Sequence, residues 1–522
     1  MSVDTLRETF HINRISTSDL QDFLTAQTYR PEITQAKNHI LSLKNCSLQA
    51  VCTKPIQQGK SPKYAEKGLK CIKPKNTNDM LVSIDDIDWI DSSTKGQIQK
   101  QKLAYGDIVI TRSGSGTIGR ASIYCYSEEA YTNDHLFVVR PDKADSHYIC
   151  SFLNSFHGQR LLEAGVSGST GQLNLSNEHI KSIPLFRPDD KVQRYIGDKV
   201  RQAEQLRAWA KRLNSVLQSQ IHSVFKGDPK PEKRIGKIIS IQQLSSLRLE
   251  AEYYGDLELW AELEIKNSPF PNKPLGELSS RIKDGPGGWA VSTSDYRPSG
   301  IPVIRSVNLI DGRCELEDCV FISKEKHNDL RSHQVKSGGL LLSVRGTIGR
   351  AAVFDSVKYS TASLNAAVVT IDCKPTINPY YLAAFLNSEV GRIQSNRIAN
   401  GAVQLNMNLK ETASNLIVIP PINLQETIAA TFLSKNRAII LANLLTQSAK
   451  TLVEALIEGQ LTEQQLIQAQ QALEDGDNSL DQAIISKLSA EGYAIEGATP
   501  LFSDVDELYS LLEDAAQAEA EE

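Results

Sequence analysis

Gly114-Ser-Gly116-Thr-Ile-Gly119 has the residue types of a dinucleotide-binding loop, G-x-G-x-x-G. In that chemistry the glycines let a pyrophosphate approach the backbone, and the following helix points its N-terminus at the phosphates. Here the next residues, Arg120-Ala-Ser-Ile-Tyr-Cys-Tyr, are typical of a strand. We therefore predict a glycine turn between two strands, and no cofactor site in this chain.

A second pattern imitates the D…E-x-K spacing of metal-dependent nucleases: Asp256, Glu264 and Lys266. The stretch 256–266 has helical character, so we interpret these residues as a solvated helix face. The sequence contains no Asn-Pro-Pro-Tyr or Asp-Pro-Pro-Tyr segment, no Walker loop and no His-Glu-x-x-His motif. None of the nine His residues forms a clear pair with a Cys or an acid at ligand spacing, so we predict no catalytic residue and no metal site.

The sequence contains a long internal repeat. Gly-Thr-Ile-Gly-Arg-Ala occurs at 116–121 and again at 346–351. Other landmarks recur in the same order: Leu153-Asn-Ser and Leu386-Asn-Ser, Gln172-Leu-Asn and Gln404-Leu-Asn, Ile183-Pro and Ile419-Pro. At the spacing of the two hexapeptides Val344 replaces Gly114. Arg112 and Arg345 lie at matching places, one strand earlier than the shared hexapeptide. A repeat of this length predicts two similar domains rather than a solenoid of small units.

Each copy alternates short strands with turns and then continues into a helix, predicted at Ser146–Glu163 and Asn378–Ser395. We therefore predict a mixed α+β fold for each copy. A longer helix then follows each proline-marked end, after Arg187-Pro188 and after Pro420-Pro421. The apolar residues of these two helices recur in steps of three and four: Ala203, Leu206, Ala210, Leu213, Leu217, Ile221 and Val224 in the first, and Leu424, Ile428, Leu445, Ala449, Leu452 and Leu456 in the second.

These stripes have nothing nearby in the sequence to cover them, which predicts that the two helices pack as an antiparallel coiled coil. The predicted organisation is a first domain at 1–188, a spacer helix at 189–225, a linker at 226–237, a second domain at 238–421, a second spacer helix at 422–460, and an acidic C-terminal tail at 461–522.

Composition is that of a globular protein of two or three domains: 522 residues, 40% hydrophobic and 23% charged. No apolar run approaches the roughly 20 residues that span a bilayer, and the N-terminus lacks an apolar signal core. The eight scattered cysteines indicate reduced cytosolic thiols. The net charge of −5 is the difference between +9 over residues 1–460 and −14 over the tail. The basic body is compatible with nucleic acid, whereas the tail indicates solvation or contact with a protein partner.

The doubled landmarks, each set leading into a long helix, resemble the specificity subunit of type I restriction-modification enzymes. Leu249-Glu-Ala-Glu-Tyr-Tyr and Leu456-Ile-Glu-Gly-Gln-Leu also fit, and the resemblance covers roughly residues 15–460. It implies a subunit without chemistry of its own, in which each target recognition domain reads one half of a split double-stranded DNA sequence. The paired helices would set the distance between the halves.

The resemblance also implies partners, in the cytoplasm. The helices would dock two methyltransferase subunits that use S-adenosylmethionine, and the assembly would recruit restriction subunits, translocase-nucleases that use ATP and Mg²⁺. Two other classes remain open from the residues: a DNA methyltransferase or nuclease with unrecognised motifs, and a protein-binding scaffold. Methylation or cleavage without a partner would favour the enzyme, and a lack of salt-sensitive DNA affinity would favour the scaffold.

Specific readout of DNA requires Arg, Lys, Asn or Gln at base edges, with further cations on phosphate. The candidates are polar residues near the glycine turn of each copy: Lys60, Lys63, Lys73, Lys75, Asn76 and Arg112 in the first, and Arg281, Lys283, Trp289, Arg305, Asn308 and Arg345 in the second. A structural pairing is the alternative for Arg112 and Arg345. The asparagines and glutamines shared by both copies, such as Asn174 and Asn406, are expected to support the fold or meet backbone.

Overall fold

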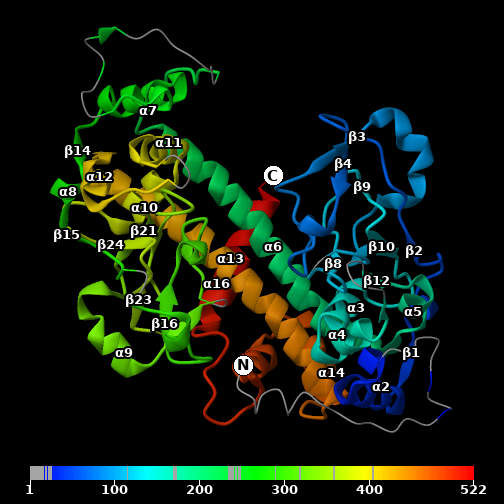
Figure 1. The fold of residues 1–522 in the computed structure, drawn as a ribbon. Coiled ribbons are helices and arrows are strands. Elements are labelled where there is room, and N and C mark those ends of the chain that lie inside the picture. Colours follow the sequence, from blue (N-terminus) through cyan, green and yellow to red (C-terminus); the bar gives the residue numbers. More distant parts are fainter. Residues whose placement is uncertain are drawn as a thin grey trace. The chain divides into compact units, whose positions relative to one another are not determined.

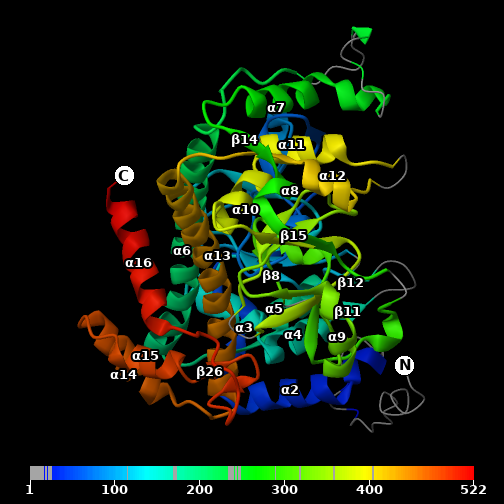
Figure 2. The ribbon, with the colours of Figure 1, turned by 90° about the vertical axis from the view of Figure 1, so that its left-hand side faces the viewer.

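A computed structural model describes most of the chain (Figures 1 and 2). The described residues are 17, 20, 26–114, 116–167, 173–232, 240, 241, 244, 248–287, 290–316, 319–356, 359–401 and 405–521. The chain divides into two compact units, residues 1–207 with 440–522, and residues 208–439. Each unit contains one copy of the repeat, which we call the first and the second domain.

The first domain is built on two sheets. One has the order β2 (Gln57–Gln58), β10 (Leu136–Val139), β7 (Ile108–Thr111) and β8 (Ala121–Ile123). The other has the order β3 (Tyr64–Ala65), β5 (Asp88–Ile90), β4 (Leu69–Ile72), β9 (Ala130–Thr132) and β6 (Lys102–Leu103). Around them lie α2 (Pro31–Ser42), α3 (Ser146–Leu153), α4 (Phe156–Glu163), α5 (Asn177–Ser182), and the paired strands β1 (Asn45–Ser47) and β13 (Pro184–Phe186).

The second domain repeats these elements in the same order. Its sheets are β15 (Ser279–Asp284), β24 (Val368–Cys373), β21 (Leu340–Ser343) and β22 (Ala351–Val353), and β19 (Val320–Ile322), β16 (Ile301–Ile304), β23 (Thr361–Leu364) and β20 (Gln334–Lys336). Its helices are α7 (Asp256–Lys266), α10 (Pro379–Asn387), α11 (Glu389–Ile398) and α12 (Leu409–Ser414), and β14 (Asn272–Pro274) pairs with β25 (Leu416–Val418). The predicted α+β class with two similar domains is confirmed.

The core residues of the two domains correspond to one another at a constant offset in the sequence. Strands of both sheets share one buried cluster in each domain, and five pairs of core residues lie 232 positions apart: Ile72 and Ile304, Leu103 and Val335, Val109 and Leu341, Ala130 and Ala362, Leu136 and Val368. A constant offset through strands of both sheets means that the packing of the core, and not only its motifs, is duplicated.

The shared hexapeptide forms the predicted turn between two antiparallel strands, β7 to β8 in the first domain and β21 to β22 in the second. Gly119 and Gly349 both have positive φ, 82° and 79°, a backbone conformation that favours glycine. Each donates its amide to the last residue of the preceding strand, Thr111 or Ser343, at 2.9 Å. The glycines therefore close a turn, and in both domains a strand follows them rather than a phosphate-binding helix.

The single helix predicted after the strands of each copy is wrong, because two helices form there in each domain. The break falls at the Leu-Asn-Ser landmark, where the serine (Ser155 or Ser388) caps the second helix by accepting a backbone N–H. The asparagine turns back to the sheet, and Asn154 and Asn387 donate to the carbonyl oxygens of Ala121 and Ala351 at 2.8 and 2.6 Å. This landmark therefore couples the helices to the strand that follows the glycine turn.

The two long helices are α6 (Asp190–His222) and α13 (Ile422–Ile457). The apolar stripe of α6 is buried along its length, and in the second unit Leu217 and Ile221 share a core cluster with Ile428 of α13. In the first unit, Arg207 of α6 donates to Asn443 of α13 at 3.0 Å. The end of α6 thus packs with the beginning of α13, which confirms the antiparallel pairing.

Helix α13 is also long and apolar enough, by length and composition alone, to cross a membrane. Half of its most apolar window is buried inside the structure. No such segment was predicted, because polar residues interrupt its apolar run.

The acidic residues 461–521 are folded rather than an extended tail. They form α14 (Glu463–Glu474), α15 (Ser479–Ile485), a hairpin of β26 (Leu488–Ser489) and β27 (Gly492–Tyr493), and α16 (Val505–Ala520). This segment packs on α6 through a buried ion pair between Lys199 and Asp481, with each carboxylate oxygen 2.7 Å from Nζ. Its attachment is therefore specific, whereas the sequence indicated an acidic tail for solvation or for contact with a protein partner.

The nuclease-like pattern of α7 lies on a helix, as predicted, but not on a solvated face. Glu264 is buried, and its carboxylate accepts the backbone amides of Gly227 and Asp228 at 2.7 and 2.8 Å. Lys266 pairs with Glu262 instead. The helix has a counterpart in α2 of the first domain, so it belongs to the repeated fold.

Candidate nucleic-acid interface

The carboxyl ends of four strands meet at one edge of each domain. In the first domain, the amides of Gly59 after β2, Asn133 after β9 and Arg112 after β7 donate to Leu136, Ile72 and His135. In the second, the same three bonds join Gly285 to Val368, Asn365 to Ile304, and Val344 to Ala367. We call this the strand-end edge: residues 59–60, 73–76, 112–113 and 133–135 in the first domain, and 285–287, 305–308, 344–345 and 365–367 in the second.

Glycine is required where this edge is tightest. A Cβ atom at Gly59 would lie 2.2 Å from the carbonyl oxygen of Asn133, and one at Gly285 would lie 2.0 Å from that of Asn365. Such distances are far inside van der Waals contact, so a side chain there would force the loops apart. The two domains thus use the same backbone arrangement to bring their variable loops together.

Asn76 and Asn308 hold equivalent turns of this edge. Asn76 accepts the amide of Lys73 at 2.9 Å and Asn308 accepts the amide of Arg305 at 3.0 Å. Both asparagines are buried. Their amide groups therefore serve the fold, and we reassign these two candidates from base contact to support of the residue that begins each turn.

Replacing Asn308 with Ala is expected to lower the free energy of unfolding by about 1–3 kcal/mol, because the backbone amide of Arg305 loses its acceptor. Urea denaturation of the full chain measures this. Val307 in the same turn is exposed, so Val307→Ala is the matched control and should change stability by less than about 0.5 kcal/mol. Equal effects of the two variants would contradict the role given to Asn308.

The lysine candidates of the first domain lie among acids. Lys63 pairs with Asp91 at 2.9 Å, and Lys73 and Lys75 both pair with Asp88, at 2.5 and 3.1 Å. The hydrogen bond from Lys73 holds the pKa of Asp88 below its usual range. Lys60 is exposed, and its carbonyl accepts Gln101 Nε2. Lys73 and Lys60 belong to the strand-end edge, whereas Lys63 lies beside β3, outside it.

Arg112 and Arg345 do not occupy matching positions. Strand register makes Arg112 equivalent to Val344 of the second domain. The backbone amide of each donates to the residue before the next strand, β10 or β24, and the carbonyl of each accepts the amide of Leu175 or Met407. Arg345 instead corresponds to Ser113, because each forms a bridge with the shared asparagine, Asn406 or Asn174. The two arginines were matched because each ends the apolar run before the shared hexapeptide, although Arg112 lies four residues before it and Arg345 one. Strand register shows that the first domain has two additional residues, Gly114 and Ser115, before its turn.

The two arginines also differ in their contacts. Arg345 is exposed and its Nε donates to Asn406 Oδ1 at 2.9 Å. The guanidinium of Arg112 forms no hydrogen bond or ion pair with any other residue that the structure describes. In the first domain Ser113 contacts His135, with Oγ 2.5 Å from Nδ1. The two edges thus carry different polar groups on one backbone frame.

The remaining candidates of the second domain begin on β15. Arg281 is exposed and donates to the carbonyl of Ser332 at 2.6 Å, and Lys283 lies 3.7 Å from Asp284. Trp289 lies outside the described residues. Arg305 follows β16 in the place that Lys73 takes after β4, so the structure brings it to the strand-end edge, together with Arg345. Arg281 lies farther back along its strand.

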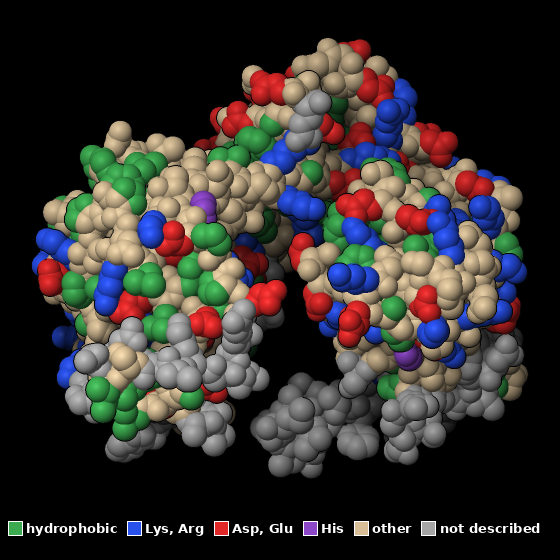
Figure 3. Space-filling model, turned by 90° about the horizontal axis from the view of Figure 1, so that it is seen from above, with side chains coloured by type: hydrophobic (Ala, Val, Ile, Leu, Met, Phe, Trp, Pro, Cys, Tyr) green, Lys and Arg blue, Asp and Glu red, His purple; other side chains and the backbone are tan. Residues whose placement is uncertain are grey.

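Charge on the molecular surface is mixed. On the face drawn in Figure 3, Lys and Arg side chains are interspersed with Asp and Glu rather than gathered in one patch. This agrees with the ion pairs of Lys63, Lys73 and Lys75. Affinity for DNA at such a surface would depend on a few Lys and Arg side chains that leave their Asp or Glu partners and bind phosphate instead.

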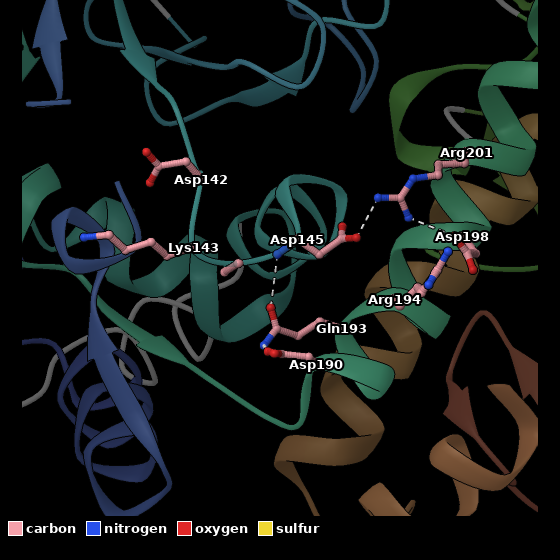
Figure 4. A pocket seen from close by; sticks show the side chains of 9 residues that line it. Asp142, Lys143, Asp145, Asp190, Gln193, Arg194, Asp198 and Arg201 are labelled. Atoms are coloured by element: carbon pink, nitrogen blue, oxygen red, sulfur yellow. Dashed lines mark hydrogen bonds and ion pairs between the residues drawn. The ribbon is translucent and has the colours of Figure 1, made fainter. Parts of the chain in front are cut away.

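A pair of glutamines, which the sequence reading missed, fixes the start of each long helix. Gln193 donates to the carbonyl of Pro188 and accepts the amide of Asp145, and Gln425 makes the same two bonds to Pro420 and Asn378. Figure 4 shows Gln193 and Asp145 in an open, charged pocket between α6 and the loop before α3. The signal was present as the same spacing, Pro188 to Gln193 and Pro420 to Gln425.

Comparison with known proteins identifies the repeated domain. Residues 44–218 match the family model of the type I restriction modification DNA specificity domain. The specificity subunit of the type I restriction enzyme EcoBI from Escherichia coli is 23% identical over 443 residues, which cover 80% of this chain and 87% of that protein.

Two solved structures also match this chain over most of their own length, at low sequence identity. The S subunit of a type I restriction-modification system from M. genitalium is 11% identical with a TM-score of 0.43, over 80% of this chain and 96% of that one. The HsdS subunit from Thermoanaerobacter tengcongensis is 14% identical with a TM-score of 0.27, over 80% and 97%.

The matched stretch contains one whole set of the elements from β1 into α6, and the second domain contains the same set again. The chain therefore has two similar domains joined by paired helices, and the first of them resembles a type I DNA specificity domain. The chain is thus similar to specificity subunits of type I restriction-modification enzymes, as the sequence resemblance predicted.

Proposed function

We propose that each domain reads one half of a bipartite DNA site through its strand-end edge. The observation that carries this proposal is that equivalent positions of the two similar domains carry different side chains. Lys73 is matched by Arg305, Lys75 by Val307, Arg112 by Val344, and Ser113 by Arg345. Because the supporting glycines and asparagines are the same in both domains, the exchanged side chains are the ones that would distinguish two DNA sequences.

The chain has no catalytic role in this proposal. Methylation would be performed by two methyltransferase subunits that use S-adenosylmethionine and dock on α6 and α13, and cleavage by translocating nuclease subunits that use ATP and Mg²⁺, all in the cytoplasm. The eight cysteines are free thiols, which is consistent with a reducing compartment.

The test is selection from a random duplex library by the full chain assembled with its methyltransferase partner, at increasing salt. The expected result is enrichment of two short conserved segments separated by a gap of fixed length. Enrichment of no such site would contradict the proposal. DNA modification by the chain alone would favour the enzyme, and the absence of any salt-sensitive affinity would favour the scaffold.

A change in the length of the paired helices should change the gap alone. Four residues inserted in α6 beside Leu213, with four in α13 beside Leu445, add about one helical turn to each and keep the apolar stripes approximately in phase. We expect the half-sites to persist while the selected gap shifts. Selection from the same library measures the shift.

The matched control is a four-residue insertion in the polar segment 226–232, which connects α6 to the second domain. It should leave the gap unchanged. Altered half-sites in the helix variant, or the same shift in the control, would show that the helices do not set the spacing.

A further inference from the structure

The first unit brings together three residues with the chemistry of metal ligands. His39 lies near the end of α2, His157 lies in the first turn of α4, and Glu458 directly follows α13. One ligand atom from each lies within 4.8 Å of the others. The sequence reading found no metal site because these residues are separated by more than a hundred positions along the chain.

A second carboxylate orients the central histidine. Glu454 accepts the backbone amide of His157 at 3.1 Å, and its other oxygen lies 2.8 Å from His157 Nδ1. With Nδ1–H donating to Glu454, the opposite nitrogen, Nε2, presents its lone pair to Glu458 Oε1 at 3.5 Å. A histidine held by a carboxylate in this way is the usual outer arrangement of a metal-bound imidazole.

In that tautomer Nε2 and Glu458 Oε1 are both acceptors, and a cation between them, either a metal ion or a proton on Nε2, removes their repulsion. His157 is buried, and two carboxylates flank its ring. Ligand atoms that surround a zinc ion at 2.0–2.2 Å are roughly 3.3 Å apart, which is close to the separation of His157 Nε2 and Glu458 Oε1. Glu458 is exposed, so its side chain can move toward the imidazole of His39, whose ring packs edge-on against His157.

The fold itself does not require a histidine here. Val390 occupies the corresponding place in the second domain, directly after the first residue of α11. It lies in an apolar cluster with Val224 and Phe225, which follow the end of α6. The same junction of domain and long helix is thus apolar in the second unit and is made of histidines and carboxylates in the first.

We propose that His39, His157 and Glu458 bind one divalent transition-metal ion of the zinc class, with Glu454 as the residue that positions His157. Two imidazoles, one carboxylate and one position open to water suit such an ion. The ion connects the end of α13 to α2 and α4 of the first domain, so its role is structural and not catalytic.

The experiment uses the untagged full-length chain, stripped with a chelator and dialysed against zinc. Metal content per chain gives the stoichiometry, and competition with a chromophoric chelator gives the affinity. Replacement of zinc by Co²⁺ reports the ligand geometry through its visible absorption. We expect one ion per chain, with affinity at least tenfold weaker in His39→Ala and Glu458→Gln. Glu454→Gln keeps all three ligands and should weaken binding by about 10–100-fold.

His222→Ala and Glu491→Gln are matched controls at exposed positions outside the cluster, and they should bind zinc as the unchanged chain does. Zinc should also raise the thermal unfolding midpoint of the unchanged chain and of both controls, but not of His39→Ala, because the ion binds the folded state. Failure of the unchanged chain to retain zinc would overturn the proposal, and so would equal binding by His39→Ala and Glu458→Gln. A stability difference of Glu458→Gln that depends on pH and not on zinc would identify a protonated His157 instead, and would also overturn it.

Discussion

Replacing Lys199 with Met is expected to lower the free energy of unfolding of the first unit by about 3–5 kcal/mol, because it leaves a buried carboxylate without its countercharge. Lys199 and Asp481 are each only 1% exposed, and the ammonium reaches both carboxylate oxygens at 2.7 Å. Tyr195 donates to the same carboxylate at 2.5 Å, and Tyr509 of α16 donates to its other oxygen. Two tyrosine hydroxyls cannot replace the lost charge.

Urea denaturation of the full chain measures the loss, and limited proteolysis should release the segment 461–522 more readily from Lys199→Met. The exposed pair of Lys181 and Glu178 supplies the control, since Lys181→Ala should cost less than about 1 kcal/mol. The double variant Lys199→Met with Asp481→Leu removes both charges and should recover most of the stability. If Lys199→Met and Lys181→Ala had equal effects, the buried pair would not be what attaches the acidic segment.

This ion pair also shows what the sequence could not predict. The charge of −14 over the last residues was visible, and it indicated a tail for solvation or for contact with a protein partner. The single buried carboxylate that anchors the segment has the same sequence appearance as the exposed ones around it. Burial of Asp481 depends on Lys199, 282 positions earlier, and a contact at that separation has no local signal in one sequence.

The duplicated frame was predictable because its physical causes are local. Glycines at positive φ, serines that cap helices and apolar residues at helical spacing are each determined by a few neighbouring residues. Reading the same signals twice in one chain made the α+β repeat and the paired helices visible. The helix break at Leu-Asn-Ser was missed because Ser155 and Ser388 also fit inside a helix. Their role as caps of the second helix became visible only with the turn of the asparagine toward the sheet.

The candidate interface was only partly predictable. Polar residue type selected Arg305 and Asn308 together, yet the structure gives them different tasks, because Asn308 is buried under the turn that Arg305 begins. Arg112 and Arg345 were matched as the arginines that end the apolar run before the shared hexapeptide, but strand register pairs Arg112 with Val344 and Arg345 with Ser113. Residue type therefore marked the correct loops, whereas strand register was needed to establish which side chains are equivalent.

Exchange of residues 268–336 for the equivalent segment of a related protein is expected to change one half of the selected DNA site and leave the other half and the gap intact. This segment contains β15, β16, β19 and β20 with the turn at Arg305, but it ends before the glycine turn at Gly346. Asn365 and Asn387 remain in place, and the incoming segment must keep a glycine at position 285 and an asparagine at position 308, which hold the strand-end edge. Specificity should therefore move with the segment while the fold and the long helices stay unchanged.

Single substitutions then separate base contacts from phosphate contacts within the same half-site. If Arg305 reads a base, Arg305→Ala should cost about 1–3 kcal/mol of binding free energy and relax selection at one position only. Uniform weakening across all sequences, with a shallower salt dependence, would instead mark a phosphate contact. The reciprocal exchange of residues 31–102 is the control and should alter the opposite half-site. If both exchanges altered the same half-site, or if neither altered any, the strand-end edge would not be the surface that reads DNA.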